Sequence, residues 1–137
     1  MRMNPKIHVF GDPSFRGKCP TEDVEQVNFY GWLKYNYPEY AELFLHPKAE
    51  GKRSGAQINY DQRTGGIPTS MPDCMIVHKM PFCVELKRQD HTQSRWQKGQ
   101  QEKLEQLHSA GCFIGVALGC EAMKEAFLQW LELINQE

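Results

Sequence analysis

The sequence predicts an α/β fold in which one mixed β-sheet is flanked by helices. Two short apolar runs, at 74–77 and 82–87, are separated by a break at 78–81 and predict two adjacent strands. A third run, at 112–118, is apolar throughout, which is typical of a strand buried on both faces. Helical patterns lie before, between and after these runs, so we expect helices to cover the faces of the sheet. They span residues 21–36, 95–109 and 121–134.

The first helical pattern begins at Thr21, a residue type that commonly caps helix N-termini. Acidic residues fill its first turn, where they interact favourably with the helix dipole. The pattern runs to about Asn36, and Pro38 either ends it or begins a short second turn through Leu43. Residues 44–46 are then expected to form a short strand.

The segment from 47 to 66 is rich in basic, small and polar residues and is expected to hold a brief helix or an ordered loop. Two interpretations stay open, a solvated surface loop and a functional loop, since long loops inside compact domains are often functional. Residues 1–20 contain several glycines and prolines and predict an irregular lead-in, with room for a short strand at 7–10. Residues 21–137 are expected to form a single domain.

The helical pattern at 95–109 contains Gly99, so its regular part is expected to begin nearer Lys98. A helix between the strands at 82–87 and 112–118 forms a crossover, which predicts parallel strands with a right-handed connection. The last helix is amphipathic. The residues expected to face inward are Ala122, Ala126, Phe127, Trp130 and Leu133.

Composition indicates an ordinary globular domain. The chain has 137 residues, 40% of them hydrophobic and 24% charged, which is enough for a core. Its longest apolar run is too short to span a bilayer, and its first residues lack the apolar core of a signal peptide, so we expect an intracellular, cytoplasmic protein and no membrane partner. The net charge of −1 excludes a protein that coats nucleic acid, so any such binding must use local basic patches.

Cysteine and histidine usage gives no sign of a zinc site. The number of cysteines, five, is odd, and no Cys-x-x-Cys motif occurs in the sequence. The five histidines are scattered along the chain and lack the spacing of zinc ligands. We expect the cysteines to be reduced thiols within the core.

Charged residues gather at the predicted hairpin of 74–77 and 82–87. Glu85 and Lys87 share one face of their strand, because side chains alternate along a strand. An antiparallel partner brings Asp73 beside them. Two carboxylates suit Mg²⁺ or Mn²⁺, and a lysine can orient water or neutralise phosphate charge. The alternative is a hairpin with solvated charges and a salt bridge.

Pro72-Asp73 followed by Glu85-Leu86-Lys87, inside a helix–strand–strand–helix–strand order, resembles the PD-(D/E)XK nuclease superfamily. The chain is more specifically similar to its virus-type replication-repair nuclease (VRR-NUC) branch, over about residues 21–127. The resemblance is to the small stand-alone phage and bacterial members. It implies a restriction-endonuclease-like mixed sheet with an α-β-β-β-α-β core.

Three further segments are similar to motifs of that family: the opening helix, a basic loop, and the helix before the buried strand. They carry Glu22, Gln26 and Trp32; His46, Pro47 and 51–54; and Ser94, Gln100, Leu107 and Gly111. The chain departs from the pattern in two places. Residues 69–71 separate Gly66-Ile67-Pro68 from Pro72-Asp73, and the spacing from Ser94 to Gln100 is longer than usual. Neither departure removes a carboxylate or the lysine.

The resemblance implies specific roles. A divalent cation, Mg²⁺ or Mn²⁺, would be held by Asp73, Glu85 and the carbonyl of Leu86, and Lys87 would position the attacking water. Glu22 would bind a second metal or a metal-bound water, or Glu25 would do so if the helix is rotated. Gln100 would support the site. The residues expected to bind nucleic acid are Lys52, Arg53, Arg63, Arg88 and Arg95.

The implied function is a divalent-metal-dependent, structure-specific DNA endonuclease of DNA repair, with Holliday junctions among its candidate substrates. One chain has room for one active site, so symmetric cuts in two strands need a two-fold homodimer. Aromatic residues of the first helical region serve either that interface or the core: Phe29, Tyr30, Tyr35, Tyr37 and Tyr40. The alternatives are a non-catalytic DNA-binding module on the same fold, and a restriction-type or RNA nuclease.

Overall fold

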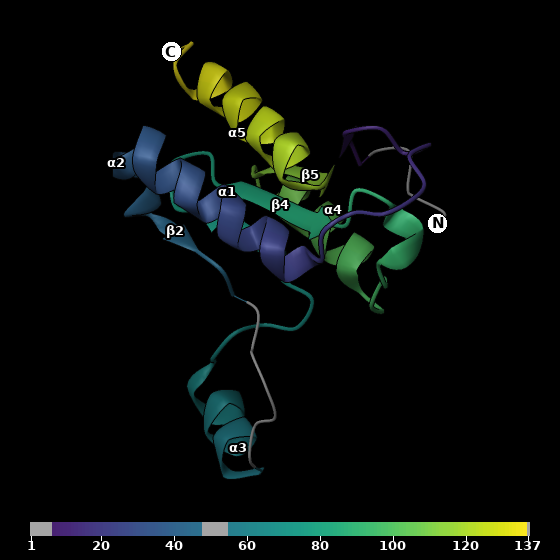
Figure 1. The fold of residues 1–137 in the computed structure, drawn as a ribbon. Coiled ribbons are helices and arrows are strands. Elements are labelled where there is room, and N and C mark those ends of the chain that lie inside the picture. The colour runs from purple at the N-terminus through teal and green to yellow at the C-terminus, as the bar shows by residue number, and fades with distance from the viewer. Residues whose placement is uncertain (1–6, 48–54, 137) are drawn as a thin grey trace.

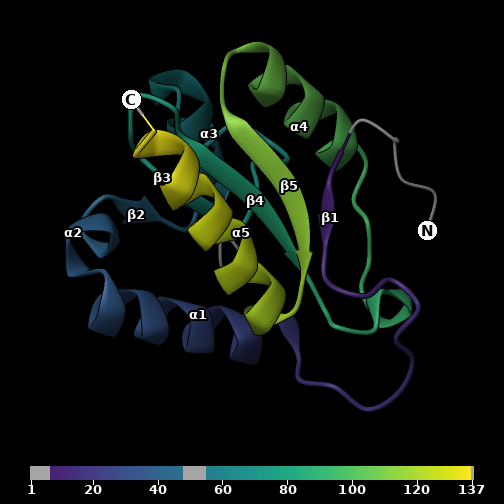
Figure 2. The ribbon, with the colours of Figure 1, turned by 90° about the horizontal axis from the view of Figure 1, so that it is seen from above.

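A five-stranded mixed sheet forms the centre of the molecule, and the computed structural model describes residues 7–47 and 55–136 of the chain. The strands follow the order β1-β5-β4-β3-β2, with helices on both faces (Figure 2), which confirms the predicted α/β fold. Their bounds are β1 Val9–Phe10, β2 Phe44–Leu45, β3 Cys74–Ile76, β4 Phe82–Lys87 and β5 Phe113–Leu118.

The predicted hairpin is present. Strands β3 and β4 are antiparallel, with Cys74 opposite Val84 and Ile76 opposite Phe82. Strand β2 continues the sheet beyond β3, also antiparallel. Residues 82–87 form β4 over the full predicted range.

Strands β4 and β5 are parallel, as the crossover predicts. The connection contains a short 3-10 helix, η1 (His91–Gln93), and helix α4 (Gln100–Ser109). A helix start at Arg95 is wrong, because Gly99 takes a left-handed φ of 92° and acts as the N-cap of α4. Residues 94–99 are a non-repetitive segment that begins extended at Ser94, ends in a turn at Lys98-Gly99, and passes over the end of β4.

One face of the sheet is covered by α1 (Glu22–Asn36) and α5 (Cys120–Ile134), which pack on each other and on β4. The side chain of Thr21 caps α1 by accepting from the Val24 amide, as predicted. Helix α2 (Pro38–Ala41) follows α1. The core here contains Phe29, Phe82, Phe127 and Trp130.

Leu133 does not face the core as predicted, since 41% of it is exposed. Ile134, four residues after Trp130, packs against the core instead, as helical spacing allows. Met123 is fully buried and was not among the predicted core residues. The other predicted inward residues of α5 are buried.

A smaller apolar cluster lies on the opposite face, under α4. It contains Ile7, Leu104, Val116 and Leu118, with Trp96 packed against it. Strand β1 pairs in parallel with β5, so the lead-in contributes an edge strand to the sheet.

Asp90 joins the lead-in to the segment after β4. Its carboxylate accepts hydrogen bonds from the amides of Gly17 and Thr92, the hydroxyl of Thr92 and the side chain of Gln93. These donors, those of Thr92 first, hold the pKa of Asp90 below its usual range. The network fixes the turn from which residues 94–99 depart.

Helix α3 (Gly55–Thr64) stands apart from the sheet and the other helices (Figure 1). Its described side chains are all exposed. A helix of this length is marginal in water without tertiary contacts. The residues on either side of α3 in the sequence come together at the sheet, where His46 Nδ1 lies 2.6 Å from the carbonyl oxygen of Asp73.

Among the described helices, none is both long and apolar enough to cross a bilayer. The five cysteines are unpaired, and Cys74, Cys83 and Cys120 are buried.

Replacing Trp130 by alanine is expected to reduce the free energy of unfolding by about 3–5 kcal/mol. The indole is fully buried, contacts Phe82 and Phe127, and donates to the Met80 carbonyl at 2.8 Å. Urea denaturation followed by circular dichroism measures the loss. The matched control is Leu133→Ala on the same helix, for which we expect a loss below about 1 kcal/mol. Equal losses in the two variants would contradict the described packing of α5.

Candidate active site

Two carboxylates meet where β3 ends beside β4. Extending the hairpin register by one residue beyond Cys74 and Val84 sets Asp73 opposite Glu85. Asp73 Oδ2 accepts a hydrogen bond from the amide of Leu86 at 3.0 Å. The contact of His46 with the Asp73 carbonyl fixes the backbone at the same point. Asp73 is therefore held from both sides of the strand end.

The carboxyl group of Glu85 is buried and incompletely paired. Only 2% of Glu85 is exposed, and its Oε2 atom has no hydrogen-bond partner. Burial raises the pKa of Glu85 well above its usual range, and the hydrogen bond and charge of Asp73 raise it further, while the Lys87 charge acts in the opposite direction. A buried acceptor without a partner is costly, so this atom is suited to a ligand that supplies positive charge.

The donors at this point fit a hard divalent cation. Glu85 and Asp73 offer carboxylate oxygens, and such oxygens are the ligands that Mg²⁺ and Mn²⁺ prefer. The amide of Leu86 points to Asp73, past the end of β3, and in a strand the carbonyl of a residue points to the same side as its amide. Within the described part of the chain no three His, Cys, Asp or Glu side chains form a metal-binding group. The carbonyl of Leu86, on the same side as its amide, is the third candidate donor.

Lys87 carries the positive charge of the site. Its side chain is 2% exposed, and its ammonium donates to the Arg95 carbonyl at 2.8 Å and to Gln100 Oε1 at 3.1 Å. Gln100 Oε1 also accepts from the Gln97 amide at 3.0 Å. The structure thus brings Gln100 to Lys87, and the longer spacing from Ser94 is absorbed by the non-repetitive segment before α4.

Glu22 reaches the site through a short hydrogen-bond chain. The amide of Arg88 donates to Ser94 Oγ at 2.7 Å, and Ser94 Oγ donates to Glu22 Oε2 at 2.7 Å. The charge of Glu22 contributes to the raised pKa of Glu85. Glu22 is therefore the carboxylate of α1 whose negative charge helps to raise the pKa of Glu85.

Glu25 faces a different element. Its Oε2 accepts from the Cys120 amide at 2.9 Å and so caps the N-terminus of α5. Gly119, which precedes that helix, has a φ of 93°, and a Cβ there would lie 2.6 Å from this oxygen. Glu25, about one helical turn from Glu22, therefore directs its carboxylate to the N-terminus of α5.

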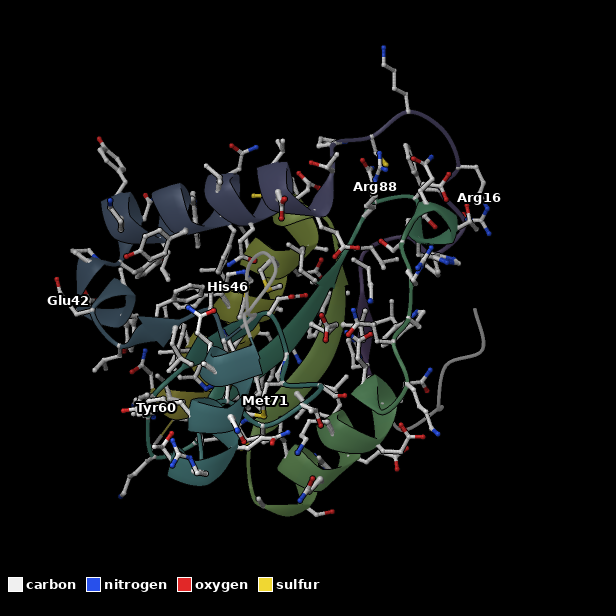
Figure 3. The ribbon with its side chains drawn as sticks, turned by 90° about the horizontal axis from the view of Figure 1, so that it is seen from below. Arg16, Glu42, His46, Tyr60, Met71 and Arg88 are labelled. Carbon is white, nitrogen blue, oxygen red and sulfur yellow. The ribbon has the colours of Figure 1, made fainter. Side chains whose placement is uncertain are left out.

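Three of the residues expected to bind nucleic acid lie in the described part of the chain, and they come from separate segments. Arg63 lies on α3 and Arg95 in the non-repetitive segment, and both are exposed. Arg88, labelled in Figure 3, lies directly after β4. Its guanidinium donates to the carbonyls of Cys19 and Pro20, which leaves fewer donors for phosphate. Lys52 and Arg53 lie outside the described residues.

Sequence reasoning missed two groups at this site. Ser94 entered only as a motif position, and its geometry makes it the link to Glu22. Trp96 was noted only as an apolar residue, yet its ring centroid lies 4.3 Å from Lys87 Nζ. The signal that could have found Trp96 is an aromatic residue on the chain that immediately follows the strand bearing the lysine.

Comparison with known proteins adds one finding. No family model matches the sequence, and no curated protein matches it. A solved structure described as a "VRR_NUC domain protein" is similar to this chain, with a TM-score of 0.66 and 21% sequence identity. The match covers 85% of this chain and 93% of that one. The chain therefore has the fold of a VRR-NUC domain protein, as the motif resemblance predicted.

Proposed function

We propose that this protein is a divalent-metal-dependent nuclease that hydrolyses phosphodiester bonds in DNA. The observation that carries the proposal is the buried Asp73–Glu85 pair, whose Glu85 Oε2 atom has no protein partner, next to the ammonium of Lys87. The fold likeness to a VRR-NUC domain protein supports the same assignment.

Asp73, Glu85 and the carbonyl of Leu86 would hold Mg²⁺ or Mn²⁺. When bound, such an ion lowers the pKa of a coordinated water and stabilises charge on the phosphate. The residues of the chain supply orientation and further charge. Phosphoryl chemistry depends mainly on positioning and electrostatics, so preorganised groups of this kind account for much of the catalysis.

Lys87 is the residue that would orient the attacking water or neutralise the phosphate. Its contacts with Arg95 and Gln100 restrict the ammonium to one place, which reduces the reorganisation needed during reaction. Glu22 adds negative charge near Glu85 and is held by Ser94, so it is suited to a second cation or to a bound water.

DNA would be bound by exposed basic side chains on segments that precede and follow Asp73 and Glu85 in the sequence. Arg63 on α3 and Arg95 beside Lys87 are exposed, and the sequence before α3 adds Lys52 and Arg53. Helix α3 lacks substantial packing against the other described elements, so a bound substrate would supply the contacts that it needs. We favour branched DNA because basic side chains on a helix that stands apart from the sheet can follow a bent or divided backbone.

A homodimer would place two such sites on one junction. The outer face of α1 exposes Val24 by 47%, Val27 by 71% and Tyr35 by 88%. These residues lie at helical spacing and form one apolar stripe. Phe29, in contrast, is fully buried, and Tyr37 and Tyr40 pack against the core. Of the aromatic residues, Tyr30, which is 38% exposed, and Tyr35 therefore remain for a two-fold interface, together with the two valines.

The wild-type protein is expected to cleave DNA with Mg²⁺ or Mn²⁺ and not with EDTA. Labelled four-way junctions, flaps, splayed arms, duplex, single strands and RNA make up the substrate panel. Lys87→Met and Asp73→Asn should each reduce kcat by about 10²–10³-fold, since each removes a preorganised charge. Glu121→Gln, on the exposed surface of α5, should keep full activity. Undiminished cleavage by both site variants would exclude this site.

Asp73→Asn is expected to leave the Tm in EDTA unchanged or higher, because it removes one of two adjacent buried like charges. In the wild type, a hundredfold excess of Mn²⁺ over Kd should raise the Tm by roughly 5–10 °C. The variant should lose that increase. Differential scanning fluorimetry measures both values, and an ion-dependent increase of equal size in the variant would be inconsistent with this ligand set.

Arg63→Gln combined with Arg95→Gln is expected to weaken DNA binding in EDTA for all sequences alike. Each lost phosphate contact should reduce the slope of log Kd against log salt concentration by about 0.9. Fluorescence anisotropy at several salt concentrations measures the slope. Lys124→Gln on α5 is the control for the loss of one surface cation and should behave as the wild type. An unchanged slope in the double variant would remove these arginines from the interface.

A further inference from the structure

The indole of Trp96 covers the ammonium of Lys87. The distance from Lys87 Nζ to the ring centroid is 4.3 Å, which is within cation–π range. Trp96 belongs to the non-repetitive segment between η1 and α4 and is half-buried. No motif of the sequence assigns it a role.

Trp96 joins Lys87 to the apolar cluster under α4. Its ring packs on the cluster formed by Ile7, Leu104, Val116 and Leu118. The other two partners are oxygen acceptors, the Arg95 carbonyl on the same segment and Gln100 Oε1 at the start of α4. The indole is therefore the contact that ties the lysine to the core under α4, and through it the segment keeps its place over the end of β4.

A cation–π contact between Lys124 and Trp32, on the surface of the molecule, has different surroundings. Lys124 lies 5.5 Å from the ring of Trp32 and is paired with Glu121 at 2.9 Å on the surface. Lys87 is buried, and a cation–π contact is worth more where the cation is desolvated. A leucine at position 96 would keep an apolar side chain against this cluster but would offer no π face to the ammonium.

We propose that Trp96 is a positioning residue, whose indole face holds the ammonium of Lys87 beside the Asp73–Glu85 pair. Its effect on cleavage rests on the proposed nuclease function and passes through Lys87. The contact itself is a property of the folded chain and is measurable without substrate or metal.

The contact is tested first by NMR in EDTA, on protein with ¹³C-labelled lysine. The ring current of Trp96 should move the ε-methylene resonances of Lys87 upfield, and Lys87→Met identifies those resonances by their absence. Trp96→Leu should return them to the position of an ordinary lysine, whereas Trp96→Phe should keep part of the displacement. Lys87 resonances at an ordinary position in the wild type would overturn the proposal.

The consequence for cleavage is tested by a double-mutant cycle. Trp96→Leu should reduce kcat by about tenfold with little change in KM, and Trp96→Phe should restore most of the loss. In a Lys87→Met background, Trp96→Leu should have no further effect. An equal reduction in both backgrounds would overturn the proposal, because Trp96 would then act independently of the lysine.

Trp32→Leu is the control for loss of an indole and should leave kcat unchanged at a temperature well below its Tm. Failure of the nuclease proposal is seen separately. A wild type that shows the displaced lysine resonances and cleaves nothing would overturn the nuclease assignment and leave the Trp96–Lys87 contact standing.

Discussion

The candidate site depends on one constraint: the carboxylates of Asp73 and Glu85 are buried side by side where β3 ends next to β4. Burial and mutual repulsion both oppose ionisation, and the raised pKa of Glu85 reflects this. The chain offsets the cost only in part, through the Leu86 amide at Asp73 and the nearby charge of Lys87. A buried carboxyl group whose pKa is shifted this far is a candidate functional site, and hard oxygen donors in this arrangement favour a divalent cation.

Each neighbouring element contributes to that arrangement through a specific contact. The hairpin register sets the carboxylates opposite each other, and the crossover through α4 returns the chain over the lysine. Helix α1 presents its first acidic residue to the same point by way of Ser94. The network of Asp90 anchors the turn that precedes this segment. The site is thus built from parts of the chain that are distant in sequence and meet at the C-terminal end of β4.

The fold and the carboxylate pair could be predicted because they follow from alternation along strands and from short-range register. Strand β4 was predicted over its full range, and Asp73 falls opposite Glu85 as the hairpin requires. The start of α4 and the orientation of Leu133 could not be predicted well, since both depend on where a helix meets the sheet. The roles of Ser94 and Trp96 depend on the path of a non-repetitive segment, for which no periodic signal exists.

The central claim is that Glu85 and Asp73 share one divalent cation. Electron paramagnetic resonance of Mn²⁺, titrated with protein, counts the bound ions directly and needs no substrate. We expect the wild type to bind Mn²⁺ at this site and Glu85→Gln to lose that binding while remaining folded. Equal Mn²⁺ binding by the wild type and Glu85→Gln, or none by the wild type at millimolar concentrations, would contradict the account.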